Sequence, residues 1–123
     1  MLSLPPTMRV YAALLPADMR KSFDGLINLT RGILGHDPMS GHLFAFFNAR
    51  RTMMKAVYWD RNGYCLVAKR LERGTFVLPP ANARGVVELE ATELALIVEG
   101  IDLSRARRRP RWSQTSTWST STT

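Results

Sequence analysis

The acidic, histidine and cysteine side chains of this 123-residue chain do not follow a spacing that predicts catalysis. No set of carboxylates has the spacing of a metal site, and no phosphate-binding glycine loop or nucleophile motif occurs. His36 and His42 share one expected loop, where a polar surface role is commoner than acid–base chemistry. Cys65 has no histidine close in sequence, which favours a small buried side chain over a nucleophile. We therefore expect a protein that is not an enzyme and that holds no metal or cofactor.

The basic side chains carry a clearer chemical signal. The chain has 17 Lys and Arg residues against 10 Asp and Glu residues, a formal net charge of +7. A protein this basic usually binds a polyanion, and nucleic acid is the commonest one. The alternative is a basic protein with no anionic partner. We expect a nucleic acid as the partner, held through its phosphates, which supply affinity without reading sequence.

Two groups of cations are candidates for this surface. The first surrounds an expected hairpin and comprises Arg50, Arg51, Lys55, Lys69, Arg70 and Arg73. The second forms an arm near the end of the chain and includes Arg105, Arg107, Arg108 and Arg109. The alternative for the first group is a solvated edge that discourages aggregation, and the alternative for the second is a solubilising tail.

The hairpin is predicted by Asn62-Gly63, which stands between two runs rich in Val, Tyr and Trp. Its expected arms are residues 53–60 and 64–71. A two-residue turn places Lys55 opposite Arg70, and a three-residue turn places Lys55 opposite Lys69. Either register sets two cations across from each other, which destabilises a sheet unless solvent, a carboxylate or a bound anion offsets the repulsion.

Two aromatic side chains of the first arm, Tyr58 and Trp59, point to opposite faces because they are neighbours on a strand. Core packing is the expected role for both. The alternative is that one of them stacks on a nucleic-acid base, as aromatic residues of single-strand binders do.

The hydrophobic pattern predicts a single α+β domain. The expected elements are a strand at 9–15, a helix from Asp18 to Leu34 that Gly35 ends, a strand at 43–47, the hairpin, short strands at 75–78 and 86–89, and a helix at 92–99. Asp18 is expected to cap the first helix, and Arg20 to pair with Asp24. We expect a curved, mainly antiparallel sheet with this helix on one face and the short C-terminal helix closing an edge or end.

The chain divides into a lead-in at residues 1–8, the domain at 9–104, and a basic then Ser/Thr-rich tail at 105–123. We expect the tail to be disordered, because it cannot bury enough apolar surface to offset its ordering entropy. A single cysteine excludes a disulfide framework, and no apolar run approaches the length that spans a membrane. With no secretory signal in view, we expect a cytoplasmic protein without a membrane partner.

Three blocks in a fixed order carry a family resemblance. They are DMRKSFDGL at residues 18–26, DPMSGHLFAFFNARR at 37–51 and KAVYWDRNGYCLVAKRLERGTF at 55–76. Together they resemble the accessory proteins encoded by the second open reading frame of bacterial insertion sequences of the sixty-six family. The similarity spans roughly residues 9–104, and the tail after Pro110 does not resemble the family.

The resemblance implies a non-enzymatic accessory factor for DNA transposition, needed beside a separate transposase. Besides the hairpin cations, it points to further motif positions, which are Asp18, Arg20, Lys21, Asp24, Trp59, Asp60 and Glu72. Our first hypothesis is DNA binding through the basic face of the hairpin. The second is a protein adaptor that binds the transposase or another element-encoded protein without contacting DNA, since the motif mixes acids with bases. A nuclease that uses Asp18, Asp24 or Asp60 is a distant third.

Overall fold

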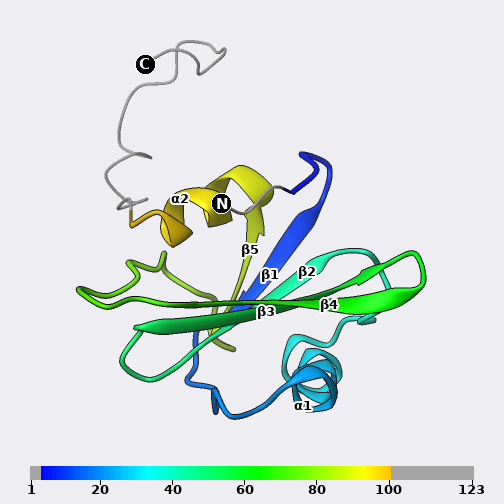
Figure 1. Cartoon of the computed structure of the whole chain (residues 1–123), viewed down its shortest axis with the longest axis horizontal. Helices are drawn as coiled ribbons and strands as arrows, with labels where there is room; N and C mark the ends of the chain where they lie inside the picture. Colours follow the sequence, from blue (N-terminus) through cyan, green and yellow to red (C-terminus); the bar gives the residue numbers. More distant parts are fainter. Residues whose placement is uncertain (1–3, 101–123) are drawn as a thin grey trace.

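The computed structural model of the chain describes residues 4–100, which fold as a sheet with a helix on each face (Figure 1). The elements in chain order are β1 (Arg9–Ala13), α1 (Phe23–Leu29), the π-helical turn η1 (Thr30–Leu34), β2 (Leu43–Phe47), β3 (Met53–Asp60), β4 (Gly63–Arg70), β5 (Val86–Glu90) and α2 (Ala91–Val98). The α+β class and the single domain are as the sequence predicts. No helix in residues 4–100 is long and apolar enough to cross a bilayer.

The five strands form one mixed sheet in the order β4-β3-β2-β1-β5. Strands β1 and β2 are parallel, with Val10 beside Leu43, and the other neighbouring pairs are antiparallel. The mainly antiparallel sheet is thus confirmed. Parallel neighbours cannot be joined by a tight turn, so the chain leaves β1, forms α1 across one face and returns to β2 in the same direction.

The central strand β2 explains why both faces of the sheet are covered. All five of its residues are buried, as is typical of a strand enclosed on both sides. Phe44 and Phe46 belong to the core that includes Leu26 of α1. Leu43, Ala45 and Phe47 belong to the core that includes Leu94 and Ile97 of α2.

The position of α2 differs from the expectation that it closes an edge or end of the sheet. Its buried residues Leu94, Ile97 and Val98 pack on the sheet face opposite α1. Strand β5 runs directly into α2, and Glu90 and Glu93 form a reciprocal capping box at the junction, with the Glu90 N–H donating to Glu93 Oε1 at 2.9 Å. A strand joined to its helix without a loop directs that helix back over the sheet.

The start of α1 also differs from the expectation. The helix begins at Phe23 after Ser22, so Asp18 is not its N-cap. Residues 18–21 instead form a turn in which the Lys21 N–H donates to the Asp18 carbonyl at 3.1 Å. The end of the helical segment is as predicted, with Gly35 in the left-handed conformation at φ 67°.

The first predicted strand is too long, and the strand predicted at residues 75–78 is absent. Strand β1 ends at Ala13 rather than Leu15, three residues before Pro16. Residues 75–78 form no strand, because their backbone contact with the β2–β3 turn is a single bond from the Phe76 N–H to the Arg51 carbonyl, at 2.7 Å.

The packing of α2 on the sheet predicts a large cost for Leu94→Ala. This side chain is fully buried, so truncation should lower the free energy of unfolding by about 2–5 kcal/mol, through lost burial and the cavity left behind. Urea unfolding followed by circular dichroism measures the change. Thr92→Ala on the exposed side of the same helix is the control, and equal effects of the two substitutions would contradict the packing.

Candidate nucleic-acid interface

The register of the β3–β4 hairpin differs from both predicted alternatives. Asp60 pairs with Gly63, so Arg61 and Asn62 form the turn, and Arg61 has the positive φ of 54°. Consequently Lys55 lies opposite Ala68, Lys69 opposite Met54, and Arg70 opposite Met53. No cation faces another cation across this hairpin, so the expected like-charge repulsion does not arise. The observed register pairs apolar residues with one another along the middle of the strands, and such cross-strand pairs stabilise the sheet. The turn residues alone do not indicate this pairing.

The two hairpin lysines point to opposite faces of the sheet. The Lys55 Nζ donates to the Lys21 carbonyl at 2.9 Å, on the α1 side. The Lys69 Nζ donates to the Val98 carbonyl at 2.8 Å, at the C-terminus of α2 on the other side. The expectation of one basic face that includes both lysines is therefore wrong. Lys69 satisfies a carbonyl at a helix end, where a positive charge also interacts favourably with the helix dipole.

The hairpin arginines, in contrast, gather where β3 begins and β4 ends. The loop after β4 lies against the β2–β3 turn, because the Leu71 N–H donates to the Thr52 carbonyl and the Phe76 N–H donates to the Arg51 carbonyl, both at 2.7 Å. Asn48 fixes the turn, since its Oδ1 accepts the N–H groups of Thr52 and Met53 at 2.9 and 3.0 Å. Four exposed arginines project from these two segments: Arg50, Arg51, Arg70 and Arg73.

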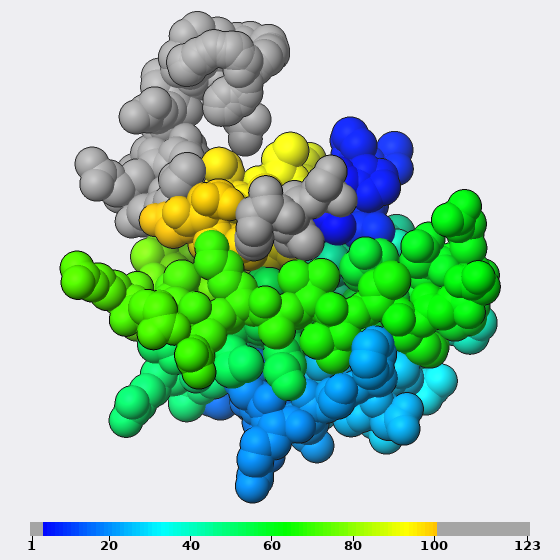
Figure 2. All heavy atoms as spheres, in the orientation of Figure 1, coloured from blue at the N-terminus to red at the C-terminus, as the bar shows by residue number. Residues whose placement is uncertain are grey.

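The segment that leads into α1 reaches the same end of the sheet. The Ala17 N–H donates to the carbonyl of Phe47, the last residue of β2, at 2.9 Å, and Lys55 binds the Lys21 carbonyl. We call this surface the basic end and define it by Lys21, Arg50, Arg51, Lys55, Arg70 and Arg73. The turn of residues 48–51 and the loop that follows β4 project from the molecule at the left of Figures 1 and 2, away from the hairpin turn.

Two acids of the predicted motif bind arginines at or near the basic end. Asp18 holds Arg20 in a forked pair, with Arg20 Nη2 2.8 Å from Asp18 Oδ2 and Nε 3.1 Å from Oδ1. This pair replaces the expected pairing of Arg20 with Asp24. Glu72 binds Arg70 more loosely, with 3.2 Å between Oε2 and Nε and both side chains exposed. Among residues 4–100, no ion pair engages Arg50, Arg51 or Arg73.

The remaining predicted positions lie elsewhere. Trp59 and Tyr64 form an edge-to-face pair with ring centroids 5.0 Å apart beside the hairpin turn, and Asp60 pairs there with Arg61 at 3.7 Å. Tyr58 points to the other face, toward Cys65, whose hydrogen bond raises the pKa of Tyr58. Asp24 is exposed in the first turn of α1. The tail arginines Arg105, Arg107, Arg108 and Arg109 lie outside the described residues.

The acids and histidines do not converge on a metal site in residues 4–100. His36 stacks on Tyr11 with ring centroids 3.8 Å apart. His42 Nδ1 accepts the backbone N–H of Arg9 at 3.3 Å. Both histidines therefore contact β1, near the beginnings of the parallel strands rather than at the basic end.

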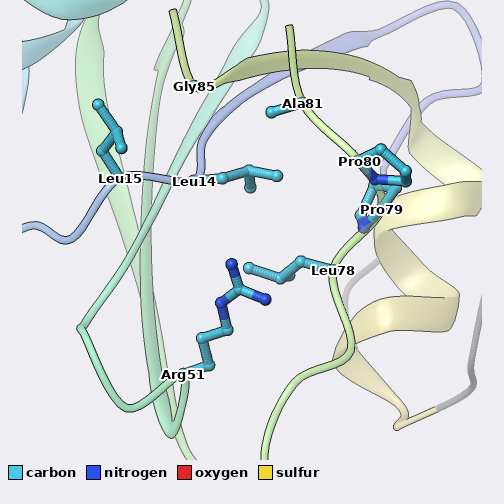
Figure 3. Close-up of a pocket in the computed structure, with 8 residues that line it drawn as sticks. All are labelled: Leu14, Leu15, Arg51, Leu78, Pro79, Pro80, Ala81 and Gly85. Carbon is cyan, nitrogen blue, oxygen red and sulfur yellow. The ribbon is translucent and has the colours of Figure 1, made fainter. Parts of the chain in front are cut away.

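Sequence reasoning missed a groove beside the basic end. It has a volume of about 530 Å³ and is lined by Leu14, Leu15, Arg51, Leu78, Pro79, Pro80, Ala81 and Gly85 (Figure 3). The lining comes from the end of β1, the β2–β3 turn and the segment before β5. No signal in the sequence predicts this groove, since segments this far apart show no shared pattern before they fold.

Comparisons with known proteins point to one family. Residues 8–108 match the family described as IS66 Orf2 like protein. The uncharacterized protein y4jC of Sinorhizobium fredii is 35% identical over 103 residues, which cover 84% of this chain and 87% of that protein. The uncharacterized protein y4hO of the same organism is 34% identical over 102 residues, 83% of this chain and 88% of that protein. No solved structure matches.

The forked Asp18–Arg20 pair predicts an unusual carboxyl titration. Hydrogen bonds from the Arg20 side chain and backbone lower the pKa of Asp18 from 3.8 to about 2. This pair should therefore stabilise the fold fully above pH 3.8, and its contribution should fade as the pH falls toward 2. NMR titration should show the Asp18 carboxyl shift near pH 2, and nearer pH 4 in Arg20→Gln. An unchanged midpoint in that variant would contradict the assignment.

The contact between Lys69 and α2 predicts a structural role for this lysine. Lys69→Gln should lower the free energy of unfolding by about 1 kcal/mol, through loss of a charged hydrogen bond at a helix C-terminus. Hydrogen exchange should rise in the last turn of α2. Arg61→Gln, on the same hairpin but remote from both helices, is the control, and a stable Lys69→Gln protein with unchanged exchange would refute this role.

Proposed function

The chain belongs to the family of IS66 Orf2 like proteins and so has an accessory role associated with the transposition of an insertion sequence, and from this premise we propose that it binds DNA through its basic end and catalyses no reaction. The partner is double- or single-stranded DNA, contacted at its phosphates. The basic end carries this proposal, because exposed cations from three separate segments are fixed there by backbone hydrogen bonds.

Rigid placement of the arginines favours phosphate binding over a merely solvated surface. The β2–β3 turn and the loop after β4 hold each other through two short backbone bonds, so Arg50 and Arg73 extend from supported segments. An arginine guanidinium can donate two parallel hydrogen bonds to one phosphate. Within residues 4–100 the partner of the Arg70 side chain is the exposed carboxylate of Glu72, and a DNA phosphate can replace that carboxylate.

The contacts proposed here are to the DNA backbone, which positions a protein without specifying a base sequence. Lys55 contributes from the α1 side, since its ammonium retains two further donors beside the bond to Lys21. Lys69 is the exception among the hairpin cations, because it extends to the opposite face. The Trp59–Tyr64 pair lies at the other end of the hairpin and is not part of this proposed surface.

A nuclease role is not favoured by the positions of the acids. Asp18 is held by Arg20, and Asp60 lies at the hairpin turn, at the opposite end from the basic end. A metal-dependent nuclease needs acids that converge on one ion.

Salt-titrated DNA binding tests the proposal. Each phosphate contact contributes about 0.9 to the slope of log affinity against log salt, so Arg70→Gln with Arg73→Gln should reduce the slope by about 2. The ligands are the terminal inverted repeat of the element, a scrambled duplex and single-stranded DNA. Equal weakening for all three would indicate backbone contacts alone.

Two controls make this experiment specific. Arg61→Gln removes an exposed arginine at the far end of the hairpin and should leave the slope unchanged. A full-length variant with Arg105, Arg107, Arg108 and Arg109 replaced by Gln measures the contribution of the arm. If only the arm variant loses binding, the basic end is not the DNA surface.

A further inference from the structure

We propose that the groove beside the basic end docks a short apolar segment of a partner protein, and that Arg51 pairs with a carboxylate on that segment. This site goes beyond the proposed DNA surface, because it recognises a peptide rather than phosphates. With this groove, the same end of the sheet can bind DNA through the basic end and another protein beside it.

The groove is built from apolar walls with fixed backbones. Leu14 and Leu15 form one wall, where the Leu14 N–H donates to the Gly85 carbonyl at 2.8 Å. Pro79 and Pro80 form part of the facing wall, and their rings restrict the backbone there. Leu15 retains 57% of its surface exposed, which is unusual for a leucine beside a concave apolar surface and leaves it available for contact. Walls that are ordered in advance reduce the entropy lost on binding.

Gly85 shows how closely these walls are fitted. Its φ is 76°, and a Cβ placed on it would lie 2.6 Å from Leu15 Cγ. Glycine therefore serves two purposes at this position, because it adopts the left-handed conformation easily and leaves room for the leucine. The exposed position of Leu15 thus depends on this residue.

Arg51 is the single charged residue among the described residues that line the groove. Figure 3 shows its guanidinium reaching toward Leu14 and Leu78. Its backbone has φ 57°, a left-handed conformation that costs an arginine free energy and costs glycine almost none. The N–H of Arg51 donates to the Asn48 carbonyl at 3.0 Å, and its carbonyl accepts from Phe76 at 2.7 Å, so the conformation is held on both sides. The fixed backbone thus directs the Arg51 side chain into the lining of the groove.

The charge of the groove identifies its occupant. A cation set among leucine and proline side chains, with no acid among the described lining residues, favours an apolar segment that carries a carboxylate. The arginine arm of this chain has the wrong charge for the site, since residues 105–111 contain five arginines and no acid. This charge excludes the arginine arm, and we assign the groove to a segment of a different protein.

A titration with synthetic peptides tests the assignment on the full chain. The probe is the acetylated, amidated hexapeptide Gly-Leu-Leu-Glu-Leu-Gly, with matched peptides that have Gln or Lys in place of Glu. In ¹⁵N-labelled protein, the amides of Leu15, Arg51 and Gly85 should shift on titration, and the Glu peptide should bind about tenfold more tightly than the Gln peptide. Equal affinity of the three peptides, or shifts confined to other residues, would overturn the proposal.

The variant Arg51→Gly separates recognition from folding. Because glycine suits the left-handed position, this variant should unfold at the same or a higher denaturant concentration, while it binds the Glu peptide about tenfold more weakly. Arg50→Gly, at the neighbouring residue that does not line the groove, is the matched control and should bind within about twofold of the natural protein. Undiminished peptide binding by Arg51→Gly would sink the proposal.

The same proteins distinguish this site from the DNA surface. Arg70→Gln with Arg73→Gln should lower DNA affinity and leave peptide affinity unchanged. If that variant loses DNA binding and neither the natural protein nor any variant binds the peptide, the groove proposal is refuted and the DNA proposal stands. Concentration-dependent dimerisation that competes with the Glu peptide and is lost in Arg51→Gly would instead assign the groove to a second copy of this chain, and would overturn the occupant proposed here.

Discussion

The parallel pairing of β1 with β2 is the constraint on which the rest of this structure depends. Two parallel neighbours need a crossover, and here residues 14–42 supply it and place α1 on one face of the sheet. Because both strands run in one direction, the segments that follow them leave the sheet at the same end. The motif around Asp18 and the turn around Arg50 are thereby brought together, although they are far apart in sequence. Ligand sites of open sheets with parallel strands commonly lie at this end.

The β3–β4 hairpin is the support that both helices share. Lys55 reaches the segment before α1, and Lys69 reaches the last turn of α2, from alternate faces of the same two strands. Hairpin cations that the sequence suggests as one group thus have different roles, because side chains along a strand point alternately to the two faces of the sheet. The exposed arginines lie in the turn after β2, at the last residue of β4 and in the loop that follows it. The cations within the strands that reach a helix or its lead-in thus differ from the arginines at the strand ends, which are available to a ligand.

Most of the secondary structure could be predicted from the sequence, because local signals decide it. The apolar run at 43–47, the two arms around Asn62 and the end of the helical segment at Gly35 are examples. The predicted helix cap at Asp18 is wrong because a carboxylate can either cap a helix or bind a nearby arginine, and Arg20 is close enough to bind it. The hairpin register was not predictable from the turn residues, since it depends on packing against two cores that the turn does not contact. The groove required the ends of three separate segments to meet.

The order of pairing along the sheet has a consequence for how the chain folds. Strands β3 and β4 close over a turn of Arg61 and Asn62, whereas β5 must find β1 across nearly the whole domain, with Arg9 beside Glu90. The entropy of loop closure grows with the length of chain enclosed, so the hairpin has the smallest barrier and the β1–β5 pair the largest. Strand β5 and the helix continuous with it are thus the natural last step of folding. Until they arrive, β1 is an open edge, and one side of the apolar strand β2 has no cover, which makes this interval the one most exposed to aggregation.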